Sequence, residues 1–187
     1  MADANLEKLY LRGREAFERR NYDYAIDLFR QILTLQPDHL DARRALRICE
    51  VKKCEEIGYP SKFSLLPLKA KTETQIRMNQ KSPDKIIEIC EAHLAKDPKN
   101  IGVRIALAQS LLALGHTNGA MAELEMAREV QQDHVDVLRL LGEVYGAQDK
   151  IPEARACITK AMQLKPDDRL LSKALNDLEA KATMAHT

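Results

Sequence analysis

Apolar residues recur along this chain with the spacing of amphipathic helices, and the pattern returns at a regular interval. Ile86, Ala120 and Ala154 are evenly spaced, and Leu107 and Leu141 repeat at the same interval. A fixed period of about 34 residues is typical of a solenoid in which each repeat contributes one helix-turn-helix unit. Because such units present long surfaces and rarely carry catalytic groups, the pattern favours a binding scaffold over an enzyme.

Residues 135–168 hold the clearest copy of the pattern. Small residues lie where the two helices would cross closely, and large residues lie where neighbouring helix pairs would meet. A proline follows the second helix and cannot continue it. The residues in question are Leu141, Gly142, Tyr145, Ala154, Ile158, Ala161 and Pro166. This series closely resembles the tetratricopeptide repeat. The resemblance implies an all-α fold, a right-handed superhelix built from antiparallel helix pairs.

Three other segments follow the same scheme to different degrees. Residues 6–39 and 101–134 match it well, with small residues such as Gly13 and Ala108 at the crossing positions. Residues 67–100 form a degenerate copy, in which the first helix, about 68–80, is polar. We expect each segment to form a helical hairpin.

The spacing fails after the first hairpin. The interval from Pro37 to Pro98 is shorter than two full periods, so one unit is incomplete. Residues 40–57 predict one long helix with no second helix after it, and the breakers Pro60 and Pro67 follow. The superhelix is therefore expected to be interrupted at this point.

This interruption predicts three parts. Residues 1–58 form an N-terminal hairpin plus one helix, residues 59–66 form an apolar linker, and residues 67–187 form three hairpins closed by a C-terminal capping helix. A module of about 57 residues buries too little surface to be stable alone. We therefore expect it to dock onto the array or onto a second chain.

The linker region carries four apolar side chains, Phe63, Leu65, Leu66 and Leu68. Loops are usually polar, because they run over the surface. Two interpretations stay open: these side chains fold back over the first helix of residues 67–100, or they form a segment for self-association or partner docking.

Composition narrows the function classes. The chain has 29 basic and 28 acidic residues, without the concentrated positive charge of a nucleic-acid or anionic-membrane binder. Its apolar stretches fall short of the ~20 residues that a membrane-spanning helix needs. Cys49, Cys54, Cys90 and Cys157 lie in helical patterns rather than in a disulfide framework, so we expect a reducing, cytoplasmic location.

Chemistry-bearing residues are scattered. Cys90 and His93 share a helical face, but the repeat pattern places both in the interior and no second Cys/His pair lies nearby. Cys49 and Cys54 are five residues apart and do not share a face. We find no phosphate-binding glycine loop and no nucleophile frame. The sequence thus predicts no catalytic site, no metal and no cofactor.

The resemblance also implies a concave groove lined by the first helix of each hairpin. In this chain the groove would present Tyr10, Arg14, Phe17, Lys71, Gln75, Met78, Ile105, Gln109, Leu112, Arg139 and Glu143. One subclass of the family grips the C-terminal carboxylate of heat-shock chaperones with a Lys, Asn, Asn, Lys, Arg set. The matching positions here keep at most one or two charges. The groove better suits an extended or helical peptide with an aliphatic anchor.

The function expected from the sequence is therefore protein binding by a scaffold or adaptor, in the assembly of a larger complex. The partner is a protein or peptide whose identity the residues do not indicate. The alternatives are a homo-oligomer that pairs modules through residues 40–68 and a chaperone of one apolar client.

Overall fold

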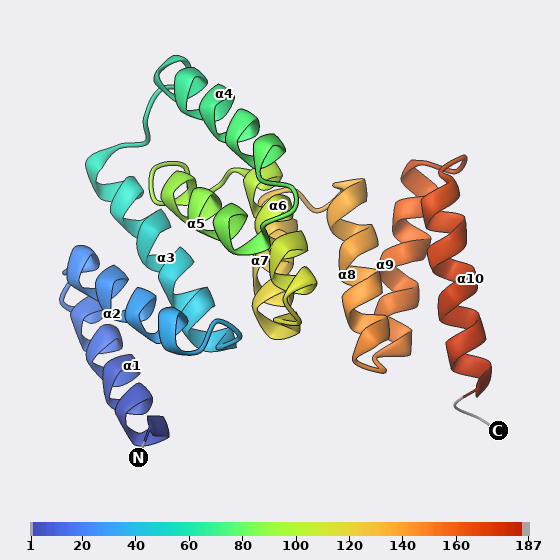
Figure 1. Cartoon of the computed structure of the whole chain (residues 1–187), viewed down its shortest axis with the longest axis horizontal. Coiled ribbons are helices and arrows are strands. Elements are labelled where there is room, and N and C mark those ends of the chain that lie inside the picture. The colour runs from blue at the N-terminus through green and yellow to red at the C-terminus, as the bar shows by residue number, and fades with distance from the viewer. Residues whose placement is uncertain (1, 185–187) are drawn as a thin grey trace. The chain divides into compact units, whose positions relative to one another are not determined.

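The structure is a computed structural model that describes residues 2–184, and within them all regular secondary structure is α-helical (Figure 1). The ten helices of this part are α1 (Ala2–Glu18), α2 (Tyr22–Leu35), α3 (Leu40–Ile57), α4 (Lys62–Met78), α5 (Pro83–Leu94), α6 (Ile101–Ala113), α7 (Thr117–Val130), α8 (Val135–Ala147), α9 (Ile151–Leu164) and α10 (Arg169–Met184). Consecutive helices pack as antiparallel pairs, which confirms the predicted all-α repeat fold.

The helices group into two compact units, residues 1–123 and residues 124–187, and the division falls within α7. The boundary predicted near residue 58 therefore lies inside the first unit. Charged side chains of α3 meet Glu91 of α5 and Glu123 of α7 in this unit, so the N-terminal hairpin and α3 dock onto the helices that follow.

The core of α1, α2 and α3 is built from one face of α2. Ile32 and Phe29 are almost completely buried, and they pack with Leu46 of α3. Gly13 of α1 lies against the Phe29 ring: a Cβ at this position would stand 2.7 Å from Phe29 Cε1. The small residue that the pattern places at position 13 is thus required by the close approach of α1 to α2.

Helices α4, α5 and α6 repeat α1, α2 and α3 along the chain. α3 corresponds to α6, since Arg43 matches Arg104 and Leu46 matches Leu107 at one constant interval. α5 corresponds in the same way to α2, since Ala25 matches Ile86 and Phe29 matches Cys90 at that interval. α7 follows α6 directly, whereas α4 stands in the chain between α3 and α5. The unit that begins with α3 thus lacks a second helix before α4 begins, and the regular spacing fails in this part of the chain.

The predicted apolar linker, residues 59–66, is largely helical, which corrects the sequence interpretation. α4 begins at Lys62, earlier than expected, and Ser61 caps it by accepting a hydrogen bond from Ser64 N at 3.1 Å. Pro67, which resembles a breaker in the sequence, lies near the start of the helix. Its missing N–H removes one backbone hydrogen bond there without ending the helix. The connection between α3 and α4 is therefore residues 58–61.

The second unit is built around α8 and α9, and α10 closes it. Gly142 of α8 faces Ile158 of α9, and Leu171 of α10 packs with Leu138 and Ala161. α10 takes the position predicted for the capping helix.

Candidate interaction surfaces

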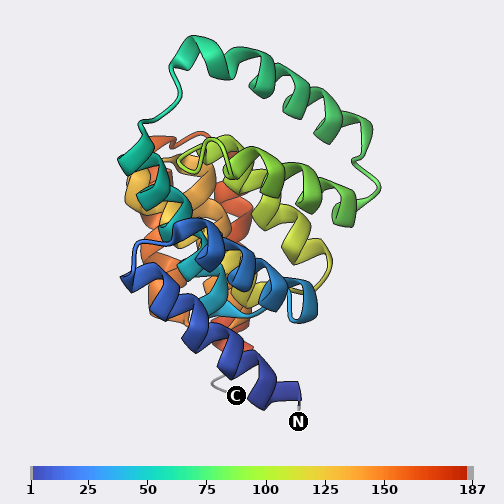
Figure 2. The same cartoon turned by 90° about the vertical axis from the view of Figure 1, so that its left-hand side faces the viewer.

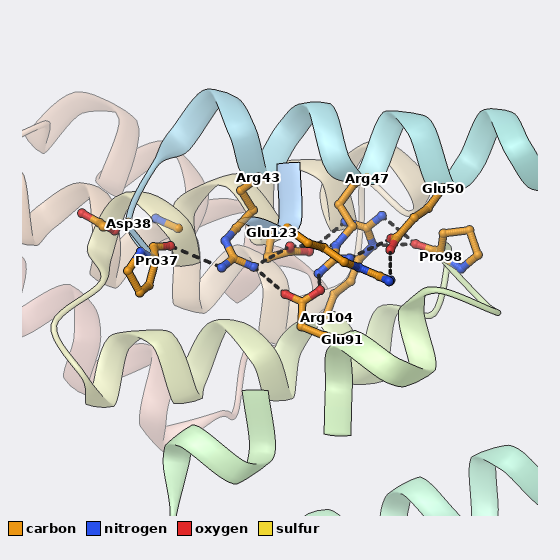
Figure 3. Close-up of polar contacts among 11 residues, drawn as sticks. Pro37, Asp38, Arg43, Arg47, Glu50, Glu91, Pro98, Arg104 and Glu123 are labelled. Carbon is orange, nitrogen blue, oxygen red and sulfur yellow. Dashed lines mark hydrogen bonds and ion pairs between the residues drawn. The ribbon is translucent and has the colours of Figure 1, made fainter. Parts of the chain in front are cut away.

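A cluster of buried charges lies between α3 and the helices that follow it in the first unit (Figure 3). It consists of three arginines and three glutamates from four helices: Arg43, Arg47 and Glu50 of α3, Glu91 of α5, Arg104 of α6 and Glu123 of α7. The Glu91 side chain is 22% exposed, and the other five side chains are at most 2% exposed. The cluster is electrically balanced, as buried charges must be.

Arg47 stands at the centre of this cluster. It donates from Nε to Glu123 at 2.9 Å, from Nη1 to Glu50 at 2.7 Å and from Nη2 to Glu91 at 2.7 Å. Burial by itself would lower the pKa of Arg47, but the carboxylates of Glu123, Glu91 and Glu50 outweigh it and hold the pKa well above its ordinary value. Arg47 is therefore a permanent cation that ties three helices together.

The other two arginines complete the cluster. Arg104 donates to Glu123 at 3.0 Å and, from Nε and Nη2, to the Pro98 carbonyl at 2.9 and 2.6 Å. Arg43 donates to Glu91 at 2.8 Å and to the Pro37 carbonyl at 3.3 Å. The guanidiniums thus also satisfy carbonyl groups in the loops before α3 and α6. This arrangement serves docking between helices rather than chemistry on a substrate.

Sequence reasoning missed this cluster, although a signal was present. Arg43 and Arg47 are four residues apart and share one face of α3. A charged residue is assigned to the surface by default. The correspondence of Arg43 with Arg104, in a matching helix, could have indicated that both occupy interior positions.

A groove of about 370 Å³ runs along α8 and α10 in the second unit. Arg139 and Glu143 of α8 form one wall, and they are joined by a hydrogen bond of 2.6 Å. Leu170, Lys173 and Asp177 of α10 line the opposite wall. Leu170 thus lies among side chains of both charges, and such a surface suits a peptide ligand.

A second groove, of about 470 Å³, lies between α4 and α6 in the first unit. Its walls carry Lys69, Glu73, Ile76, Arg77 and Gln80 from α4 and the turn after it, and Asn100, Gly102, Val103 and Ala106 from α6 and its cap. The α4 wall is mostly polar, and the α6 wall is mostly small. The α8–α10 and α4–α6 grooves are thus both large enough for a peptide segment.

A cavity of about 910 Å³ lies along α9 and α10 in the second unit. Its three basic side chains are already paired: Arg155 with Glu179, Lys160 with Asp133 and Lys181 with Asp149. The basic side chains of this cavity are thus engaged within the chain, as Arg139 is by Glu143 in the α8–α10 groove.

The predicted groove residues fall into different environments. Tyr10 and Phe17 are half-buried against the α1–α3 core, where Tyr10 stacks on His39 and Phe17 packs on Tyr22. Arg139 and Glu143 are brought together in the α8–α10 groove. The others are exposed or half-buried, and none of them lines the α4–α6 groove: Arg14, Lys71, Gln75, Met78, Ile105, Gln109 and Leu112. Their role in binding stays a prediction.

The apolar segment of residues 63–68 forms the first part of α4. Phe63 is 84% exposed and Leu66 is 56% exposed, whereas Leu65 and Leu68 are half-buried. The segment therefore buries only part of its apolar surface within this chain.

The cysteines and His93 have structural surroundings. Cys90 is fully buried, and desolvation raises the pKa of its thiol to about 12. His93 is buried and contacts Thr72 Oγ1 of α4 through Nδ1 at 2.8 Å. Among residues 2–184, no three His, Cys, Asp or Glu side chains gather in a way that could hold a metal ion. The helices in this range are also too short or too polar to cross a membrane.

Comparisons with known proteins agree with this geometry. Residues 78–142 match a model of the tetratricopeptide repeat. A curated relative from Oryza sativa subsp. japonica, "DnaJ protein P58IPK homolog B", is 23% identical over 192 aligned positions, which are 92% of this chain and 41% of the relative. The chain thus spans less than half the length of that relative.

Solved structures show the same fold at low sequence identity. The first TPR domain of Spaghetti (RPAP3) bound to the HSP90 peptide SRMEEVD is 18% identical, with a TM-score of 0.59 over 70% of this chain and 99% of that one. YrrB, described as a TPR protein with an unusual peptide-binding site, is 14% identical, with a TM-score of 0.51 over 90% of each chain.

Proposed function

This chain is a tetratricopeptide repeat protein, and on that premise we propose that it is a protein-interaction scaffold that binds a peptide or partner segment. Structural relatives bind peptides, the HSP90 peptide in one case. The binding we propose takes place in the α8–α10 groove and serves the assembly of a larger complex in the cytoplasm.

The α8–α10 groove carries this proposal. Arg139 and Glu143, which are paired with each other, lie on one wall, and Lys173, Asp177 and Lys181 lie on the other, so both walls carry charges of both signs. Leu170, which is 60% exposed, supplies an apolar contact on the α10 wall. A peptide with an aliphatic side chain and flanking charges matches this pattern. Because both walls are rigid helices, binding orders few receptor groups and loses little entropy.

We do not propose the heat-shock carboxylate clamp for this chain. By the family resemblance, two of the clamp positions in the C-terminal helices are Ala106 and Leu140, which offer no hydrogen-bond donor from their side chains. Leu140 is also 4% exposed and is part of the core. We therefore expect a ligand that is recognised along its length rather than by a terminal carboxylate. We also propose no catalytic role for this chain.

The test is site-specific photo-crosslinking in cells with the full chain. A photoreactive amino acid replaces Glu143 or Lys173, one on each wall of the groove, or Glu153 on the exposed surface of α9 as the control. The proposal expects the same crosslinked partner from positions 143 and 173, identified by mass spectrometry, and its absence from position 153. Leu170→Ser in the same chains should reduce the yield at least fivefold.

Different partners at positions 143 and 173, or equal yields from the control position, would contradict binding in this groove. A yield that Leu170→Ser leaves unchanged would contradict the proposed apolar contact. Thermal melting of each variant confirms that the second unit is folded.

A further inference from the structure

Helix α4 is held to its own chain by a narrow strip of contacts. All of its residues are described, and among them Thr72 alone is buried. Its hydroxyl contacts His93 of α5, and Leu65, Leu68 and Ile76 are half-buried on the same side. Figures 1 and 2 show α4 on the outer side of α5, away from α1 and α2. Most of the surface of α4 therefore faces away from the fold.

The outward surface of α4 is apolar at its beginning. Phe63 and Leu66 are 84% and 56% exposed. They are three residues apart and share one side of the helix, and Ala70 continues this stripe one turn later. Exposed side chains of this size in one stripe mark an interaction surface, whereas singly scattered ones need no explanation.

The same surface is basic. Residues 62–78 contain four basic side chains and one acidic side chain, whereas the rest of the chain carries 25 basic and 27 acidic ones. Lys69 is 3.9 Å from Glu73. Among the described residues, Lys62, Lys71 and Arg77 form no ion pair. The positive charge of these three side chains is thus available to a binding partner.

The charge decides between the possible occupants of this surface. A second copy of α4 would bring two helices of the same positive charge together, which is unfavourable. An anionic membrane would attract the lysines, but the groove between α4 and α6 is concave and carries Glu73 and Gln80 on its wall. A helix with acidic side chains fits both the stripe and the groove, because amphipathic helices bind grooves through anchors at i, i+3 and i+7.

We propose that the outer face of α4, with the α4–α6 groove beside it, binds an acidic amphipathic helix of a partner protein. The apolar stripe of that helix packs on Phe63 and Leu66, and its carboxylates face Lys62, Lys69 and Arg77. α4 is about 25 Å long, at 1.5 Å per residue, and can contact four to five turns of such a helix. This surface is separate from the α8–α10 groove, so either site can fail without the other.

The experiment measures fluorescence anisotropy with the full chain and labelled synthetic helices of about five turns each. One helix has a leucine stripe flanked by glutamates, the second has the same stripe flanked by lysines, and the third contains the residues of the first in an order without a stripe. We expect the acidic helix to bind at least tenfold more tightly than either of the others. Raising the salt from about 0.15 to about 0.5 M should weaken it severalfold.

Three variants of the chain locate the site. Phe63→Ser with Leu66→Ser should weaken the acidic helix at least tenfold. Lys62→Glu with Lys69→Glu should reverse the preference, so that the basic helix binds more tightly, a result that misfolding cannot produce. Leu35→Ser, which changes a 65% exposed leucine of α2, is the control and should leave both affinities unchanged.

The outcomes that overturn the proposal are distinct. No binding by the acidic helix, equal binding of the acidic and basic helices, or binding that the Phe63/Leu66 variant leaves intact would each do so. Light scattering that shows a dimer of the native chain and a monomer of that variant would make a second copy the occupant. Sedimentation with vesicles of phosphatidylcholine and phosphatidylserine, lost in the same variant, would make the occupant a membrane.

Discussion

Arg47 of α3 and Glu123 of α7 are joined at 2.9 Å although they lie far apart in the sequence, and both side chains are completely buried. This ion pair fastens the N-terminal hairpin and α3 to the rest of the first unit. A buried charge is costly unless it is paired, so each member of the pair depends on the other. Docking through matched charges also makes the contact specific, because a displaced α3 would leave buried charges without partners.

The first prediction concerns the loss of one charge from this cluster. Glu123→Gln keeps the size of the side chain but leaves Arg47 and Arg104 short of a counterion. We expect the free energy of unfolding to fall by about 3–5 kcal/mol. Urea denaturation followed by circular dichroism measures it. The control is Glu179→Gln, which removes an exposed ion pair with Arg155 and should cost less than about 1 kcal/mol.

A double substitution separates lost packing from unpaired charge. Arg47→Met with Glu123→Leu removes both charges and keeps apolar volume. It should be less destabilising than Glu123→Gln alone, because it leaves two arginines against two glutamates in the cluster, whereas Glu123→Gln leaves three arginines against two glutamates. If the double variant were the less stable of the two, the contribution of the charges would be smaller than proposed.

The second prediction uses the opposite pKa shifts of two glutamates in the cluster. Burial would raise the pKa of Glu91, but the guanidiniums of Arg47 and Arg43 outweigh it and hold the pKa below its usual range. Burial raises the pKa of Glu50 in spite of Arg47. Glu91 therefore stabilises the fold above its unfolded pKa of about 4.3, and this contribution is lost as the pH falls through its folded pKa. Glu50 contributes with the opposite sign.

The measurement is the slope of unfolding free energy against pH in the acidic range. Glu91→Gln should make this slope less positive, since a group that binds fewer protons in the folded state is removed. Glu50→Gln should make it more positive, since the removed group binds more protons in the folded state. Slopes that change in the same direction in both variants would contradict the assigned shifts.

The third prediction concerns the closest approach of α8 and α9. A Cβ on Gly142 would stand 2.5 Å from Ile158 Cγ1 and 3.2 Å from the Ala154 carbonyl oxygen. Gly142→Ala should lower the stability of the fold by about 1–3 kcal/mol, because the helices must separate. Adding Ile158→Ala should relieve this clash, so the two substitutions together should cost less than the sum of their separate effects.

The matched control for this substitution is Gly102→Ala in the first turn of α6. A Cβ there would meet nothing nearer than Asn100 Oδ1 at 3.6 Å. Alanine favours the helix more than glycine does, by about 0.5–1 kcal/mol. Thermal unfolding should therefore give shifts of opposite sign for the two substitutions. A loss of stability in both variants would mean that the effect at position 142 is not steric.

The repeat fold could be predicted from the sequence because its signals are local. The small residues at positions 13 and 142 mark helix crossings, and the structure places Phe29 and Ile158 against them. The regular return of the apolar pattern indicates the helix pairs. The start of α4 could not be obtained this way, since Pro67 resembles a breaker in sequence and the cap that Ser61 provides shows only in the structure.

The candidate surfaces were less accessible to sequence reasoning, because they depend on contacts between distant residues. The family pattern places Tyr10 in a groove, and the contacts of its ring with Phe29 and His39 could not be read from that pattern. The Arg47–Glu123 pair joins residues on helices that no repeat period relates. Arg139 and Glu143 could be placed together because they lie four residues apart on one helix, so local geometry sufficed.

The last prediction concerns a helix cap supplied by a distant loop. Asp38 precedes α3, yet its carboxylate accepts a hydrogen bond from the Gly119 backbone N–H at 2.8 Å and another from Asn118 Nδ2 at 2.9 Å. It thus occupies the N-terminus of α7, where backbone N–H groups lack partners within the helix and favour a negative charge. Asp38→Ala should destabilise the first unit by about 0.5–2 kcal/mol.

Two comparisons make the test of this cap specific. Asp38→Asn keeps a hydrogen-bond acceptor without the charge and should recover part of the loss, whereas Asp133→Ala, which removes an exposed ion pair with Lys160, should have little effect. Hydrogen exchange then reports where stability is lost. Because Asp38 joins the loop before α3 to α7, Asp38→Ala should speed exchange at Gly119 and also in α3, and exchange that rises in α7 alone would show a local cap with no part in docking α3.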